Sequence, residues 1–213
     1  MLSQPERDQE LSLLLEKQPY TISLDGLSLE VQKSVFPSDQ GYTSTHLAQV
    51  IQRYHPQRAL DMGCGTGYLA LLLKKNGASE VWAVDRYRLA WACTMHNAFR
   101  NHLTLHFQES DLFTDVPLRK FDLVVFDQSY YPSSNNLFGP CSDGGKEIIE
   151  RFLHEVPPYL SSNGVIIMPF SDMAGKSNDP QEIAIAHDFK VRTVMKTENE
   201  FGSHSIYQIS LKT

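Results

Sequence analysis

Strand-like and helix-like segments alternate along the chain from residue 58 to residue 170. The runs RALDM (58–62) and EVWAVD (80–85) have the length and apolar character of buried strands, and residues 66–76 between them have the character of a helix. The predicted elements that follow are a helix over 87–100, strands over 103–108 and 121–127, a helix over 146–160 and a strand over 164–170. Strands linked by helices form a parallel sheet with right-handed crossovers and helices on both faces.

The C-terminal part departs from this alternation. Two segments of alternating apolar and polar residues, FKVRTVMK (189–196) and SIYQISLK (205–212), are joined only by TENEFGSH. So short a connection permits an antiparallel pair and no crossover. The predicted fold class is therefore α/β, a doubly wound, mostly parallel sheet of seven strands that ends in an antiparallel hairpin.

A short extension is predicted before this sheet. YTISLDGLSLEV alternates apolar residues around Asp25-Gly26, a dipeptide that favours a two-residue hairpin turn. Leucines within residues 6–16 indicate a short amphipathic helix ahead of the hairpin. We expect residues 1–34 to form this extension and residues 35–213 to form one domain.

The segment after the hairpin leads into a further helix. It is a polar loop followed by a helix from about residue 45 to residue 54, for which Thr43 or Ser44 is available as the N-cap.

Composition limits the compartment and the partners. No apolar run is long enough to span a membrane, and the first residues lack the basic and apolar regions of a secretion signal. Three cysteines without a C-x-x-C pair argue against disulfides and zinc, and the scattered histidines give no metal site. A net charge of −6 disfavours strong non-specific binding of nucleic acid. We predict a cytoplasmic protein without a metal, and the sequence does not indicate its oligomeric state.

A glycine turn follows the first strand of the sheet. Asp61 precedes three glycines at alternate positions, Gly63, Gly65 and Gly67. Ligands of doubly wound sheets lie at the carboxyl ends of the strands, where glycines let the backbone approach closely. The dinucleotide fingerprint requires a third glycine where this chain has Tyr68, and the Asp61 carboxylate would repel a pyrophosphate. The turn therefore favours a positively charged adenosine ligand.

Two more acids end the next two strands. Asp85 follows the second strand and is suited to accept hydrogen bonds from both hydroxyls of a ribose. Asp111 follows the third strand and is suited to accept from the amino group of an adenine.

Together these motifs resemble the class I S-adenosylmethionine-dependent methyltransferases, whose Rossmann-like sheet also ends in an antiparallel hairpin. The resemblance extends from about residue 31 to the end of the chain. It implies S-adenosyl-L-methionine as the cofactor, and it implies these contacts: Asp61, Gly63, Cys64 and Gly65 for the methionine part and ribose, Asp85 and Arg86 for the ribose, and Asp111 and Leu112 for the adenine.

The fourth strand ends in DQSYYP, which looks like the [N/D/S]-x-P-[Y/F/W] signature of methyltransferases that modify planar amino groups. The nitrogen of such a group has its lone pair in the π system, so the enzyme must hold both N–H bonds with acceptors. The resemblance makes Asp127 the first acceptor, the carbonyl of Gln128 the second, and Tyr130 the stacking ring. Asp127 and Tyr130 are the predicted catalytic residues, although Ser129 stands where the signature has proline. Asp127 is also a predicted cofactor contact, at the methionine end.

The flanking segments resemble the release-factor glutamine methyltransferases. The hairpin with VFPSDQGYTSTHL, and DGGKEIIERFLHEV further on, match segments of that group, which places Phe36, Tyr42 and Thr43 at the cofactor pocket. Those enzymes carry a larger N-terminal helical domain for their substrate, which this chain lacks in its roughly 20 residues before the hairpin. The long loop over 128–143 is predicted to cover the substrate.

Several functions remain open from the sequence. The methyl acceptor can be a protein glutamine amide, a nucleobase or a small molecule, and a binding protein that has lost turnover is a further alternative. A nicotinamide-dependent oxidoreductase is disfavoured by Tyr68.

Overall fold

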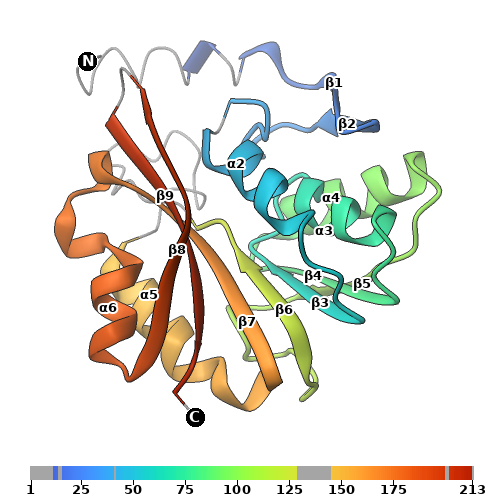
Figure 1. The fold of residues 1–213 in the computed structure, drawn as a ribbon. Helices are drawn as coiled ribbons and strands as arrows, with labels where there is room; N and C mark the ends of the chain where they lie inside the picture. The colour runs from blue at the N-terminus through green and yellow to red at the C-terminus, as the bar shows by residue number, and fades with distance from the viewer. Residues whose placement is uncertain (1–11, 14–15, 41, 129–144, 200–201, 213) are drawn as a thin grey trace.

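A seven-stranded sheet with helices on both faces forms the body of the molecule (Figure 1). The structure is a computed structural model, and it describes residues 12–13, 16–40, 42–128, 145–199 and 202–212. Most of the helix predicted over residues 6–16 lies outside the described residues, as do Ser129, Tyr130 and nearly all of the predicted substrate loop.

The strand order in the sheet is β5-β4-β3-β6-β7-β9-β8. Its strands are β3 (Arg58–Met62), β4 (Glu80–Asp85), β5 (His106–Glu109), β6 (Phe121–Phe126), β7 (Leu160–Ser171), β8 (Phe189–Asn199) and β9 (Gly202–Leu211). Strands β3 to β7 run parallel to one another, whereas β9 runs antiparallel to both β7 and β8. The predicted fold class is confirmed, including the antiparallel C-terminal hairpin.

Two layers of helices cover the sheet (Figure 1). The α-helices are α2 (Tyr42–Ile51), α3 (Tyr68–Lys75), α4 (Arg88–Arg100), α5 (Lys146–Glu155) and α6 (Pro180–Ala186), and short 3₁₀ turns occupy Pro157–Tyr159, Asp172–Ala174 and Lys176–Asn178. Helices α2, α3 and α4 lie on one face, and α5 and α6 lie on the other. Among the described residues, no helix has the length and apolar character needed to cross a membrane.

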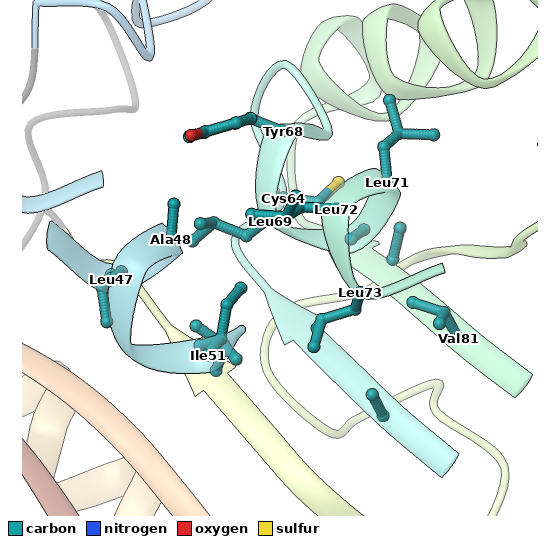
Figure 2. Packing of buried hydrophobic residues seen from close by; sticks show 14 of the residues in the cluster. Leu47, Ala48, Ile51, Cys64, Tyr68, Leu69, Leu71, Leu72, Leu73 and Val81 are labelled. Atoms are coloured by element: carbon teal, nitrogen blue, oxygen red, sulfur yellow. The ribbon is translucent and has the colours of Figure 1, made fainter. Parts of the chain in front are cut away.

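Alternate residues of each central strand supply the two halves of the core. On β6, Leu123 and Val125 belong to the cluster beneath α2 and α3, whereas Val124 and Phe126 belong to the cluster beneath α5. Figure 2 shows leucines of α3 near Ala48 and Ile51 of α2, and Cys64 of the glycine turn belongs to the same cluster. Burial on both faces holds the central strands in one register, which fixes the positions of the residues at their carboxyl ends.

The predicted N-terminal hairpin is confirmed, with β1 (Tyr20–Leu24) and β2 (Leu27–Val31) paired around Asp25 and Gly26. The hairpin forms its own two-stranded sheet and packs on the helices next to the glycine turn. The backbone N–H of Glu30 donates to Asn97 Oδ1 of α4 at 2.8 Å. The Tyr68 hydroxyl donates to the Asp25 carboxylate, so the residue that replaces the third glycine joins the hairpin to α3.

The secondary-structure prediction was wrong in several places. Strand β5 begins at His106 rather than at residue 103, and α5 ends at Glu155, so that β7 already begins at Leu160. Helix α2 begins at Tyr42 rather than near residue 45, so Thr43 and Ser44 lie in its first turn and neither is its N-cap. Helix α6 was not predicted. It follows an Asp-Pro pair in which the Asp179 side chain accepts from the Gln181 N–H at 2.9 Å, a helix-start signal that the sequence did contain.

Candidate active site

The glycine turn is built on hydrogen bonds to the neighbouring strand. The N–H groups of Gly63 and Cys64 both donate to the carbonyl of Val84 on β4, at 2.7 and 3.0 Å. The three glycines have φ angles of 73°, 54° and 83°, a region that residues with a side chain rarely adopt. The spacing of the glycines is therefore required by the backbone path between β3 and α3.

The glycines differ in what surrounds them. A Cβ atom at Gly67 would lie 2.7 Å from Thr94 Cγ2, so this glycine permits close packing of the turn on α4. A Cβ atom at Gly65 would meet nothing within 4 Å. The backbone at Gly65 therefore faces open space at the carboxyl end of the sheet, where a ligand can approach it.

Three acids surround this turn on one face of the sheet. Asp61 on β3 pairs in register with Ala83 on β4 and with Val125 on β6. Asp85 and Asp127 lie two residues beyond those partners, so they flank Asp61 on the same face and closer to the carboxyl edge. This arrangement gathers three carboxyl groups at one point.

Asp61 is the most deeply buried of the three, with 2% of its surface exposed. Its Oδ2 atom accepts from the Ala70 N–H of α3 at 3.0 Å. Burial raises the pKa of Asp61 to about 8, and the neighbouring Asp127 and Asp85 add to the rise against the lowering effect of the Ala70 N–H. A cation placed beside Asp61 would favour its ionised form.

Asp85 fixes the turn from the end of β4. Its Oδ2 atom accepts from the Gly65 N–H at 3.0 Å and its Oδ1 atom accepts from the Tyr87 N–H at 2.9 Å. Burial raises its pKa, against the lowering effect of these hydrogen bonds. A carboxylate oxygen accepts more than one hydrogen bond, so Asp85 can still receive the hydroxyls of a ribose. The guanidinium of Arg86 lies over the Tyr87 ring, 4.7 Å from its centre.

Asp111 and Leu112 follow β5 in a strained turn. Leu112 has a φ angle of 50°, and its carbonyl accepts from Ser110 Oγ at 2.9 Å. Asp111 Oδ2 accepts from Arg151 Nη2 at 3.0 Å. The other oxygen, Oδ1, is buried and has no hydrogen-bond partner among the described residues. It is a suitable acceptor for the amino group of a bound adenine.

Asp127 directly follows β6 and is held by helix α2. Ser44 Oγ donates to Asp127 Oδ2 at 2.5 Å, and the Thr43 side chain also hydrogen-bonds to this carboxylate. Burial raises the pKa of Asp127 to about 6, although both hydrogen bonds oppose the rise. The role of Ser44 could not be read from the sequence, because 83 positions separate it from Asp127.

Gln128 is a site residue whose side chain was not considered in the sequence prediction. It is 5% exposed, and neither its Nε2 nor its Oε1 atom has a hydrogen-bond partner among the described residues. A buried amide without a partner is costly, so it marks a position where a ligand or another segment supplies the hydrogen bonds.

The other predicted residues are placed as follows. Cys64 is buried in the turn, and its sulfur accepts from Thr94 Oγ1 at 3.2 Å. Phe36 is 36% exposed in the segment between β2 and α2. The Tyr42 side chain and all of Tyr130 lie outside the described residues.

The arrangement fits S-adenosylmethionine. The backbone at Gly65 faces open space that a ligand can occupy. Asp111 Oδ1 has no hydrogen-bond partner among the described residues and can accept one from the ligand. The carboxyl groups of Asp61, Asp85 and Asp127 favour a ligand with a positive charge.

Comparison with known proteins agrees with this fit. The profile of the Methyltransferase small domain family matches residues 27–203. A Methanocaldococcus jannaschii protein, provisionally named a protein N5-glutamine methyltransferase, is 31% identical over 73% of this chain and 81% of its own length. A ribosomal protein L11 methyltransferase of Thermosipho melanesiensis is 30% identical over 60% of this chain, which spans only 44% of that enzyme.

Solved structures share the fold. A T. thermophilus 16S rRNA N2 G1207 methyltransferase, solved with AdoMet and guanosine, superimposes with a TM-score of 0.70 at 16% identity, over 91% of this chain and 50% of that one. A methyltransferase from Pyrococcus furiosus gives a TM-score of 0.64 at 17% identity, over 99% of this chain and 100% of its own.

Proposed function

The chain belongs to the Methyltransferase small domain family and is an S-adenosylmethionine-dependent methyltransferase, and we propose that it methylates the side-chain amide nitrogen of a glutamine in a protein. The family disagrees with the oxidoreductase alternative. The names of the M. jannaschii and T. melanesiensis relatives both support a protein as the acceptor, and the first supports glutamine.

The observation that carries the proposal is the position of Asp127. Its carboxylate ends β6 on the same face as Asp61, and Ser44 and Thr43 hold it in place. An amide nitrogen is a weak nucleophile because its lone pair is delocalised, so the enzyme must fix the two N–H bonds while the methyl group approaches. Asp127 supplies an acceptor for one N–H bond. The carbonyl of Gln128 is proposed as the second acceptor and Tyr130 as the stacking ring.

The pKa of Asp127 sets the pH range in which this acceptor works. With a pKa of about 6, the carboxyl group is ionised at neutral pH and protonated in more acidic solution. A protonated carboxyl group has one oxygen that donates, so it holds an amide N–H less well. Activity is therefore expected to fall below about pH 6.

The residues around the glycine turn are proposed to hold the cofactor. Asp61 favours its cationic methionine end, Gly63, Cys64 and Gly65 let it approach the backbone, and Asp85 with Arg86 lies at the ribose. Asp111 and Leu112 are proposed at the adenine, and Phe36 and Thr43 at the opposite wall. When bound, the cofactor supplies an electrophilic methyl group on a sulfonium.

We propose that residues 35–213 form the catalytic domain and that residues 1–34 extend it. A cytoplasmic location is proposed from the three cysteines, which form no C-x-x-C pair.

The test is transfer of a tritiated methyl group from the cofactor into an extract of the source cells. We expect label that is sensitive to protease and resistant to nuclease, and we expect it to be lost with Asp127→Ala. The exposed Asp115→Ala variant is the matched control. Label that nuclease removes, or label in the low-mass fraction, would contradict a protein acceptor.

A further inference from the structure

A groove with two arginines lies between α2 and the β8–β9 hairpin, at the opposite end of α2 from Ser44 and Asp127. Its volume is about 470 Å³, and its walls include Arg53 and Tyr54 after α2, Arg192 on β8 and Gln208 on β9. Figure 1 shows α2 next to this hairpin, on the face that also carries α3. The groove opens at the surface, since both arginines are exposed.

The positive charge of the groove is not neutralised within the described part of the chain. Arg192 Nη2 and the Tyr54 hydroxyl both donate to Gln208 Oε1, at 2.8 and 2.7 Å. No carboxylate of the described residues forms an ion pair with Arg53 or Arg192. A neutral amide therefore orients Arg192 while its charge stays available, in a protein whose net charge is −6.

Helix α2 connects this groove to Asp127. Ser44, which holds Asp127, lies in the first turn of the helix, and Arg53 follows the last turn. Nine residues at 1.5 Å per residue separate the two ends by roughly 14 Å. An extended peptide covers that distance with about four residues at 3.3 Å each.

We propose that this groove binds an acidic segment of the protein acceptor. A Glu or Asp side chain of that segment would contact Arg53 and Arg192, about four residues from the target glutamine. The proposal rests on the proposed function, because it extends the acceptor site of Asp127. Two arginines suit a single carboxylate, whereas the backbone of a nucleic acid needs a longer positive surface than a chain of net charge −6 offers here.

The first test measures methyl transfer to synthetic peptides that contain one glutamine. One set carries a glutamate three to five residues before or after the glutamine, and the matched set carries serine instead. We expect the wild-type enzyme to prefer a peptide with glutamate at about four residues by about tenfold in kcat/KM. The double variant R53A/R192A should lose that preference, chiefly through KM. K120A, which removes an exposed lysine before β6, should keep it.

A binding measurement separates this inference from the proposed function. Fluorescence anisotropy with the labelled acidic peptide and S-adenosylhomocysteine reports binding without turnover. Arginine-dependent binding without methylation would support the groove and contradict glutamine as the target. Methylation of both peptide sets at equal rates, unchanged in R53A/R192A, would support the function and overturn the groove. Arginine-dependent binding of a short single-stranded RNA, with no preference for the acidic peptide, would also overturn the groove.

Discussion

Asp61 makes binding of the cofactor depend on pH. In the structure its carboxyl group is buried beside Asp85 and Asp127, and its pKa is raised to about 8. At neutral pH the free protein therefore holds this group mostly protonated. A cation bound at the glycine turn favours the carboxylate, so binding releases a proton. Affinity must then rise with pH up to the pKa of the free protein.

The size of the effect follows from the fraction of Asp61 that is ionised. A carboxyl group with a pKa of about 8 is about one-tenth ionised near pH 7 and about one-hundredth ionised near pH 6. If the bound state needs the carboxylate, Kd rises roughly tenfold for each unit that the pH falls, or about 1.4 kcal/mol. An ordinary aspartate is fully ionised over this range and would give no slope.

Isothermal titration calorimetry with S-adenosylmethionine, in the absence of a methyl acceptor, between about pH 6 and pH 7.5 measures this slope, and buffers of different ionisation enthalpy count the protons released. We expect nearly one proton released near pH 7. Asp61→Asn should bind more weakly and without the slope, while the exposed Asp115→Asn should behave as wild type. A wild-type Kd that does not change with pH, or proton release that persists in Asp61→Asn, would refute the reasoning.

Three further changes test the site and its supports. Asp127→Ala should lower kcat by about 100-fold in steady-state kinetics and change the Kd of S-adenosylhomocysteine by less than about threefold in calorimetry. Equal losses of kcat and of cofactor affinity would contradict a role at the acceptor. Gly67→Ala should lower the free energy of unfolding by about 2 kcal/mol, because Gly67 has a φ of 83° and the new Cβ would clash with Thr94. An unchanged midpoint of urea unfolding would contradict this. Tyr68→Phe should cost about 1 kcal/mol by losing the bond to Asp25, and no cost would show that the hairpin is held by packing alone.

The positions of the acids could be predicted because each lies close to the carboxyl end of a strand. Asp61, Asp85 and Asp111 follow short apolar runs, and parallel strands bring their carboxyl ends to one edge of the sheet. The same reasoning placed Asp127 at that edge. The roles of these residues at the cofactor and acceptor stay predictions, since they come from the resemblance to a family.

Contacts between distant segments could not be predicted. Thr43 or Ser44 was expected to cap a helix, but α2 begins earlier, and the Ser44 hydroxyl donates to Asp127 on the face of the sheet that α2 covers. Local sequence gives the preference of Ser for a helix start and gives no information on a partner so far along the chain. The arginine groove could not be predicted for the same reason. Arg53 follows a helix and Arg192 lies on an edge strand, and only the tertiary fold brings them together.

The chemical identity of the methylated residue tests the central claim most directly. The radiolabelled protein product is digested completely with proteases, and the free amino acids are separated by chromatography and identified by mass. We expect the label in N5-methylglutamine. Label in methyllysine, in a methylated N-terminal residue or in a methylated nucleobase would contradict an active site built to hold a planar glutamine amide at Asp127.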